Sequence, residues 1–184
     1  RKATVGAKVI ANRLTNSTTA IVVALGTNDM ISKSESWYPS YAIDTVMQQA
    51  GDLPVLWVNL EFSPTGRADW RARGVRFNRA LRAATNRYPN LVIADWNTFF
   101  TPKRQSRFVA DGVHLTVTGY KTRTSYFINQ MRLFGQRIVE QNDNHFHNNQ
   151  HNIDNDDNGA CNITNLHHAF DGGNNSNKRT IDVT

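Results

Sequence analysis

Three short apolar runs separated by helical patterns are the feature that most constrains the fold of this chain. The runs are "TAIVVAL" (19–25), "LPVLWVNL" (53–60) and "NLVIAD" (90–95), each continuous and rich in β-branched residues. Such runs are typical of strands buried on both faces, as in a parallel sheet covered by helices. The fold class is therefore predicted to be α/β.

Helical periodicity fills the intervals between these runs. Apolar residues recur every three to four positions over residues 41–51 and 68–88, and Gly51 suits the cap of the first of these helices. Residues 1–14 predict an amphipathic helix, and a last helix is expected from about Val117 to Gln141. The predicted order is helix–β–α–β–α–β–α.

Composition divides the chain near Gln141. Residues 1–141 carry a formal net charge of +10, whereas residues 142–184 carry −4. The second part is dominated by Asn, Asp and His, holds five of the six histidines and has few apolar residues for a core. We therefore expect an α/β domain over 1–141 and a low-complexity, disordered tail over 142–184.

Two kinds of metal binding compete with disorder in the tail. The His-rich part could bind a transition metal weakly. The segment "DNDDNG" fits the first half of a calcium loop, with Asp154, Asp156 and Asn158 as oxygen ligands and Gly159 at the turn. The closing glutamate of such a loop would fall at Asn165, so the calcium pattern is incomplete. No metal or cofactor is predicted for the α/β domain.

Other features bear on partners and compartment. The lone cysteine, Cys161, excludes an internal disulfide framework without fixing the compartment. No apolar run approaches the roughly 20 residues that a membrane-spanning helix needs. Seven arginines between Arg67 and Arg87 indicate a solvated helix face or, alternatively, attraction to an anionic surface. Few aromatic residues interleave with them and no nucleic-acid motif occurs, so nucleic acid is not an expected partner.

Two polar clusters are expected at one edge of the sheet. "GTND" (26–29) follows the first run, and "DGVH" (111–114) lies beyond the third. Each alone is compatible with an ordinary turn. In an open parallel α/β sheet, however, sites form where loops leave the carboxyl ends of the strands. Together, the two clusters therefore indicate a functional site.

These residue types match the needs of acyl transfer by a serine. The reaction requires a neutral imidazole to accept the hydroxyl proton and a carboxylate to orient that imidazole. His114 and Asp111, three positions apart, supply both. Asn28 is a candidate donor to the developing oxyanion, and Gly26 lets the backbone come close. Asp29 and Trp37 are candidate substrate-binding residues.

"VVALGTND" with "DGVHLTVTGY" resembles two sequence blocks of the SGNH (GDSL-type) hydrolase family. The stretches "PVLWVNL" and "LVIADW" and the C-terminal helix resemble its actinobacterial and phage-associated branch and the related cell-wall O-acyltransferase domains. The resemblance covers about residues 1–141. It implies a flavodoxin-like, three-layer α/β/α fold with a parallel sheet, and ester hydrolysis or acyl transfer without a metal. His114 would be the base, Asp111 its orienting acid and Asn28 an oxyanion donor.

The chain departs from that family at the nucleophile. The family's Gly-Asp-Ser block, which follows its first strand, has no counterpart, and "GDS" occurs nowhere. We therefore expect the sheet to lack its first strand, which leaves an uncovered apolar edge on the 19–25 strand. The segment that carries the serine is expected upstream, on a separate chain, or lost from the gene. Ser63, in "EFSPTGR", would stand at the correct edge, but Pro64 after it indicates an ordinary turn.

Three hypotheses follow for function. The leading one is an SGNH-type ester hydrolase acting on an O-acylated carbohydrate or lipid; Asp29, where many acyltransferase-linked relatives have glycine, favours it. The second is an O-acyltransferase that acts on a cell-wall carbohydrate. The third is a catalytically inactive scaffold or binding remnant.

Overall fold

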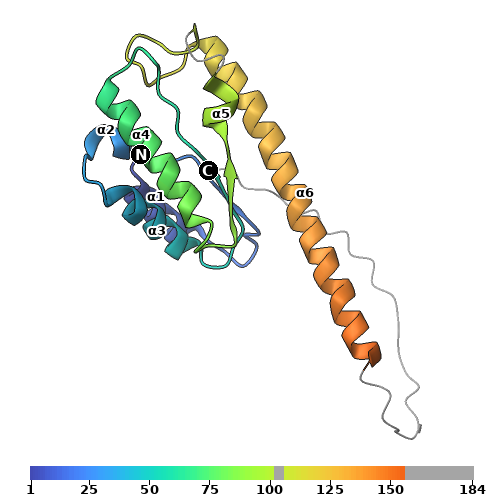
Figure 1. Ribbon diagram of the computed structural model, residues 1–184. Coiled ribbons are helices and arrows are strands. Elements are labelled where there is room, and N and C mark those ends of the chain that lie inside the picture. The colour runs from blue at the N-terminus through green and yellow to red at the C-terminus, as the bar shows by residue number, and fades with distance from the viewer. Residues whose placement is uncertain (102–105, 156–184) are drawn as a thin grey trace, which may run out of the picture. The chain divides into compact units, whose positions relative to one another are not determined.

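A three-stranded parallel sheet in the order β1-β2-β3 forms the centre of the α/β unit (Figure 1). The computed structural model describes residues 1–101 and 106–155, with side chains to residue 143. The strands are β1 (Ile21–Val23), β2 (Val55–Val58) and β3 (Leu91–Ala94). In register, Ile21 pairs with Val55, which in turn pairs with Leu91. The predicted α/β class with a parallel sheet is confirmed.

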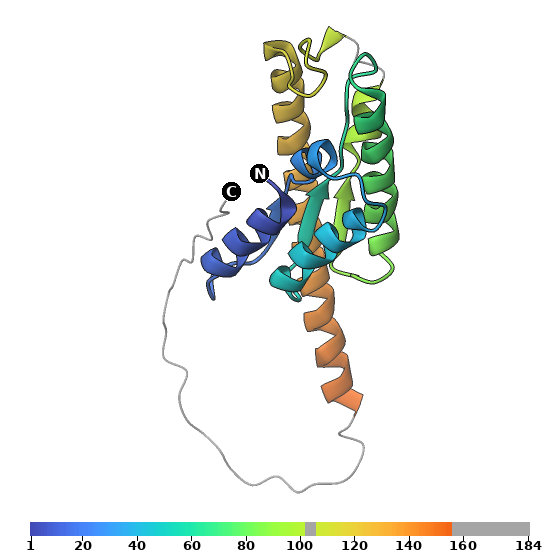
Figure 2. The same cartoon turned by 90° about the vertical axis from the view of Figure 1, so that its left-hand side faces the viewer.

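Helices connect and cover the strands. They are α1 (Ala3–Arg13), α2 (Thr27–Ser32), α3 (Tyr38–Ala50), α4 (Ala68–Ala84), α5 (Trp96–Phe100) and α6 (Val117–Asn155). Contacts link α1 to α3 and α3 to α4, so these three helices lie side by side on one face of the sheet. The first part of α6 lies on the opposite face (Figures 1 and 2). This arrangement has the three predicted layers.

Side chains alternate along β2 between two apolar layers. Val55 and Trp57 belong to the core cluster beneath α1, α3 and α4, where Phe77 of α4 is fully buried. Leu56 and Val58 are also buried but stand outside that cluster, as expected for the opposite face. A strand buried on both faces explains why this sequence is a continuous apolar run rather than an alternating one.

Aromatic residues join the start of α6 to α5. The ring of Trp96 stacks on Phe100 at 4.2 Å between centroids and lies 5.3 Å from that of Tyr126. Phe99 lies 4.6 Å from Tyr126. These contacts fix the beginning of α6 against the end of β3, and with it the loop that precedes α6.

The sequence patterns did not predict α2 and α5. α2 begins within "GTND" itself and buries Asp29 and Met30. In α5, Asp95 is the N-cap and its side chain accepts from the N–H of Thr98 at 3.2 Å. Both helices are too short for periodicity to reveal them.

The end of α6 also differs from the prediction. The helix continues to Asn155, into the segment expected to be a disordered tail. Asn and His have low helix propensity, but a helix that is already nucleated extends with each added hydrogen bond. Contacts divide the chain at Gly135, so the α/β unit ends at Phe134 and the later part of α6 belongs to a second unit. The predicted domain boundary at Gln141 stays a prediction.

The tail residues named as metal ligands lie at or beyond the end of the described side chains. The calcium alternative, with Asp154, Asp156 and Asn158, and the transition-metal alternative in the His-rich part are therefore outside the side chains that the structure describes.

Candidate active site

The Asp111–His114 pair is held in a tight turn between two short extended segments. Phe108 and Leu115 form an antiparallel bridge, and the N–H of Val109 donates to the carbonyl of His114 at 2.9 Å. At the tip of the turn Gly112 adopts a φ of +74°, a left-handed conformation that favours glycine. The turn thus brings two residues three positions apart into direct contact.

Asp111 binds the imidazole and its own turn at the same time. Its Oδ2 lies 2.6 Å from His114 Nδ1. Its Oδ1 accepts the backbone N–H groups of Val113 at 2.8 Å and of His114 at 2.9 Å. The hydrogen bond from His114, followed by those from the two N–H groups, lowers the pKa of Asp111 to about 2. The carboxylate is therefore charged at neutral pH.

The second imidazole nitrogen is directed away from Asp111. A hydrogen bond from Nδ1 to a carboxylate fixes the tautomer in which Nε2 can accept a proton. The side chain of His114 is 69% exposed, so a reacting hydroxyl could reach this nitrogen. Chemically, the pair is competent as an oriented general base.

Asn28 and Gly26 lie where β1 ends. Gly26 precedes α2, has a φ of +120° and packs against the ring of Phe77. Asn28 is exposed on the first turn of α2, and its carbonyl accepts the hydroxyl of Ser32 at 2.8 Å. Within the described part of the chain, no hydrogen bond links Asn28 to the Asp111–His114 turn.

The turn that carries Asp111 and His114, called the dyad turn below, is attached to the loop that follows β2. The N–H of Ser63 donates to the carbonyl of Gly112 at 3.0 Å. Because β1 and β2 are parallel, Asn28 and this loop both follow carboxyl ends of strands. "GTND" and "DGVH" therefore lie at the same edge of the sheet, as predicted.

Asp29 lies in the interior rather than on a substrate-facing surface. It is 0% exposed, and both carboxylate oxygens accept hydrogen bonds, Oδ2 from the N–H of Ala3 and Oδ1 from the hydroxyl of Tyr38, each at 2.9 Å. Asp29 thereby ties the start of α1 to α3. This placement corresponds to a structural role, which the sequence pattern did not suggest.

Trp37 lies in a small exposed aromatic cluster at the start of α3. Its side chain is 60% exposed, and its ring centroid lies 5.7 Å from those of Tyr38 and Tyr41. Tyr41 is also exposed, whereas Tyr38 is buried. The presence of Tyr41 beside Trp37 was not predicted. The two residues are four positions apart, a spacing that places side chains next to each other on a helix.

The hydroxyl of Ser63 is not accessible to a substrate in the way a nucleophile must be. The residue is 2% exposed, and its hydroxyl pairs with that of Thr65 at 2.9 Å. The N–H of Thr65 also approaches the Ser63 hydroxyl at 3.3 Å. The expectation of an ordinary turn at Ser63–Pro64 agrees with this geometry.

Most arginines of the α4 region contact other parts of the protein. Arg67 and Arg73 pair with Asp69, and Arg73 also donates to the carbonyls of Met30 and Ile31 at the end of α2. Arg87 pairs with Asp44 of α3. These contacts favour the interpretation of a structural helix face over that of a docking surface for an anionic polymer.

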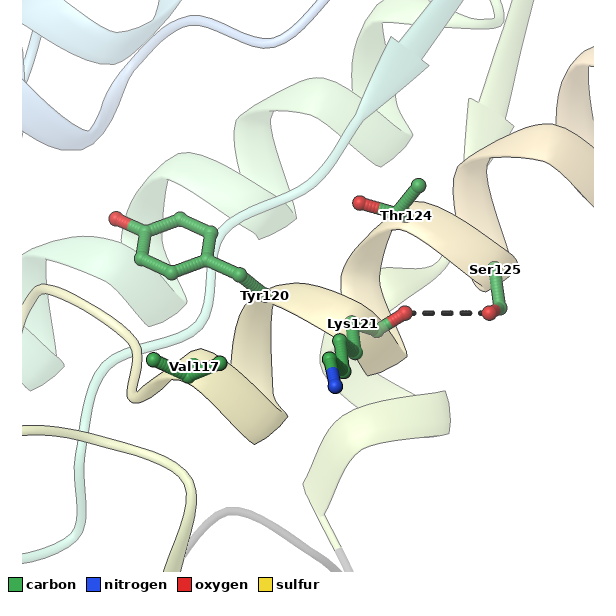
Figure 3. A pocket seen from close by; sticks show the side chains of 5 residues that line it. All are labelled: Val117, Tyr120, Lys121, Thr124 and Ser125. Atoms are coloured by element: carbon green, nitrogen blue, oxygen red, sulfur yellow. Dashed lines mark hydrogen bonds between the residues drawn. The ribbon is translucent and has the colours of Figure 1, made fainter.

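A shallow depression lies on the first turns of α6 (Figure 3). Val117, which is 74% exposed, and Tyr120 project from the helix there, and the hydroxyl of Ser125 donates to the carbonyl of Lys121 at 3.2 Å. The depression is lined by Val117, Tyr120, Lys121, Thr124 and Ser125. It begins three residues after His114 and presents apolar groups to solvent.

The described residues contain neither a metal-binding cluster nor a membrane-spanning helix. No group of three or more His, Cys, Asp or Glu side chains is arranged to hold a metal ion. Within the same residues, no helix is long and apolar enough to cross a membrane.

Comparison with known proteins identifies the fold. No protein-family model matches the chain, and no curated protein sequence matches it. Among solved structures, the α/β fold is similar to that of a lipase/acylhydrolase. That structure is the crystal structure of the lipase/acylhydrolase from Enterococcus faecalis, with a TM-score of 0.61 and 18% sequence identity; the match covers 74% of this chain and 72% of that chain.

Proposed function

We propose that this chain provides the base, the orienting acid and part of the oxyanion hole of an SGNH-type serine ester hydrolase. The single observation that carries the proposal is the 2.6 Å contact between His114 Nδ1 and Asp111 Oδ2 on an imidazole side chain that is 69% exposed. The position of this pair at the carboxyl edge of a sheet similar to that of a lipase/acylhydrolase supports it.

In the proposed reaction, His114 Nε2 takes the proton of a serine hydroxyl as its oxygen attacks the ester carbonyl. Asp111 stabilises the imidazolium that forms. The side-chain N–H of Asn28 donates to the oxyanion, and the absence of a side chain at Gly26 lets the backbone approach the substrate. The alcohol leaves with the proton from Nε2, and His114 then activates water to hydrolyse the acyl-enzyme.

The serine is proposed to come from outside the described residues. Ser63, the serine in contact with the dyad turn, is buried and hydrogen-bonded. β1 is an edge strand with an apolar sequence, and α6 exposes Val117 and Tyr120. A segment made of one strand and one helix, with a serine between them, would cover both surfaces and bring its hydroxyl to the carboxyl edge. Such a segment is the partner that this function requires.

The substrate is proposed to be an O-acylated carbohydrate or lipid, bound beside Trp37. The exposed Trp37 and Tyr41 rings are suited to contact a sugar face or an acyl chain. The same observation favours a second candidate function, transfer of the acyl group to a carbohydrate hydroxyl. Asp29 is assigned no substrate contact, because its oxygens are buried and occupied.

The test is hydrolysis of a chromogenic acetyl ester by the chain alone and by the chain extended with the residues encoded before Arg1. We expect turnover only in the extended protein. His114→Ala should then reduce kcat by several orders of magnitude, whereas Ser63→Ala, which removes only a hydroxyl of the 63–66 loop, should lower kcat by no more than about 100-fold. A labelled acyl donor with added oligosaccharide separates hydrolysis from transfer by its product.

Two results would count against the proposal. Activity of the unextended chain that Ser63→Ala abolishes would place the nucleophile at Ser63. An extended protein that folds but does not turn over any acyl ester would leave the inactive scaffold as the better interpretation.

A further inference from the structure

The dyad turn contacts the body of the protein through a glycine–glycine contact that the catalytic proposal does not use. A Cβ on Gly112 would lie 2.6 Å from the Cα of Gly66, and a Cβ on Gly66 would lie 3.2 Å from the Cα of Gly112. Real Cβ atoms essentially never approach other atoms to 2.6 Å, and Gly112 also has a φ of +74°, so this position requires glycine. The 3.2 Å contact at Gly66 is tight, and a side chain there would push Gly112 away by a few tenths of an ångström. The N–H of Ser63 secures the same contact by donating to the Gly112 carbonyl.

The loop that receives Gly112 is itself fixed by α4. Arg71 Nη1 donates to the carbonyls of Pro64 and Gly66, both at 2.5 Å. Ser63 and Thr65 hold the inside of the loop through their hydroxyl pair, and the N–H of Gly66 donates to the Ser63 carbonyl at 3.1 Å. An unbroken series of contacts therefore runs from α4 through residues 63–66 to Gly112, the neighbour of Asp111.

Arg71 is suited to such a role by its chemistry. A guanidinium offers several donors in a rigid plane, so one side chain can bind two carbonyls of a bent loop at once. Other arginines of the helix bind elsewhere: Arg73 donates to the end of α2, and Arg76 to the Ser34 carbonyl at 3.2 Å. Arg71 is thus the α4 arginine that the structure connects to the dyad.

We propose that Arg71 is a positioning residue, which acts through the 63–66 loop and the Gly66–Gly112 contact to hold Asp111 and His114 in hydrogen-bonding geometry. This inference rests on the proposed function for its catalytic meaning, but the positioning itself is a property of the chain alone. A side chain two contacts removed from Gly112, the neighbour of Asp111, thereby sets how well the imidazole is oriented.

The first experiment measures the dyad directly in the 184-residue chain, without any need for turnover. Arg71→Met keeps the apolar stem and removes the donors; Arg71→Lys restores a charge and donors of another geometry. NMR follows the His114 Nδ1 proton and the titration of the Asp111 carboxyl. We expect Arg71→Met to speed exchange of the Nδ1 proton and to raise the Asp111 midpoint from about 2 toward 3.8, with partial rescue in Arg71→Lys.

Matched controls separate positioning from general loss of structure. Arg79→Met removes an exposed arginine of the same helix and should leave both signals unchanged. The indole N–H of Trp57, which donates to the Leu25 carbonyl in the core, reports whether each variant remains folded. Gly66→Ala, which presses a methyl group on Gly112, should perturb the dyad signals in the same direction as Arg71→Met.

The proposal is overturned if a folded Arg71→Met protein retains the wild-type Asp111 midpoint and Nδ1 exchange rate. If Arg71→Met unfolds the chain, Gly66→Ala decides by the same two signals. In a catalytically complete form, Arg71→Met should lower kcat by up to about 100-fold with little change in KM. Failure of that form to turn over esters would contradict the proposed function while leaving the NMR result on positioning intact.

Discussion

Asp111 receives hydrogen bonds from three donors, one imidazole and two backbone N–H groups. The two backbone bonds close the turn, and the side-chain bond orients His114. One residue therefore shapes the local backbone and orients the imidazole. This dual role explains why Asp, Gly and His can form a dyad within four consecutive positions, without side chains brought together from distant elements.

The stabilisation by Asp111 has a defined pH window. Its pKa is lowered from 3.8 to about 2, first by the His114 hydrogen bond and then by the two N–H groups. A carboxyl whose pKa is depressed in the folded state stabilises that state above its unfolded pKa and loses this contribution as pH falls through the folded pKa. We expect the contribution to be complete above about pH 5 and lost toward pH 2.

Carboxyl-detected NMR on the wild type and His114→Ala measures this effect. The variant should titrate at a higher pH than the wild type yet below 3.8, because the two N–H donors remain. Equal midpoints in the two proteins would show that the imidazole does not contribute.

The two buried hydrogen bonds of Asp29 contribute to the stability of the fold. Asp29→Ala would leave the N–H of Ala3 and the buried Tyr38 hydroxyl without their acceptor, and each unsatisfied buried group costs about 1–3 kcal/mol. We expect a loss of about 3 kcal/mol in the free energy of unfolding by urea, and a smaller loss for Asp29→Asn, which keeps one acceptor oxygen.

Tyr38 gives an independent readout of the same contact. Burial and then the Asp29 hydrogen bond raise the pKa of Tyr38 to about 12. In Asp29→Asn the pKa of Tyr38 should fall but stay above 10.0, since burial remains. An unchanged titration, followed by ultraviolet absorbance, would show that the hydroxyl does not depend on Asp29.

At the scale of elements, the strands and long helices could be predicted because their buried positions are occupied by apolar residues at regular spacing. "VLWV" is apolar throughout because both faces of β2 are covered, and the α3 and α4 patterns follow from one buried face each. The short helices α2 and α5 carry no such pattern. Both helices form where the chain turns at the end of a strand. The only local signal in the sequence was Asp95, which caps α5.

The candidate site was predictable only where its residues are close together in the sequence. Asp111 and His114 are close in sequence, so their contact needed only a turn. The interior position of Asp29 was not predictable, because it depends on α1 and α3 meeting at one point. The contact between Gly66 and Gly112 likewise joins loops that are remote in sequence.

The passage from β1 to α2 gives a prediction for one element boundary. A Cβ at Gly26 would lie 2.7–3.0 Å from atoms of the Phe77 ring, at a φ of +120°. Gly26→Ala should therefore destabilise the protein by about 2 kcal/mol or more, through overpacking and backbone strain. Gly135→Ala is the matched control: it meets nothing within 4 Å on a helix and should stabilise by up to about 1 kcal/mol. Thermal unfolding of both variants measures the contrast, and equal effects would contradict it.

At the scale of the α/β unit, the sheet has an asymmetry between its two edges. β3 is followed by α5, whose rings pack on α6, whereas β1 pairs only with β2 within the described part of the chain. The sequence around β1, from Thr18 to Leu25, contains no charged residue and no proline. Natural edge strands usually carry such groups, because an unprotected edge pairs with other strands. The edge of β1 is therefore suited to a partner strand.

An unprotected edge predicts concentration-dependent self-association of this chain when no partner strand is present. Two copies can pair β1 against β1, and a lysine in the centre of that strand would oppose the pairing, because like charges facing one another across an interface cost several kcal/mol. We expect Val22→Lys to weaken association by roughly tenfold or more in sedimentation experiments over a range of concentrations. The matched control is Val75→Lys, which changes a 57% exposed valine on α4 and should leave association unchanged. If both lysines act alike, net charge rather than strand pairing governs association. If Val22→Lys alone dissociates the complexes, the β1 edge is the surface through which the copies pair.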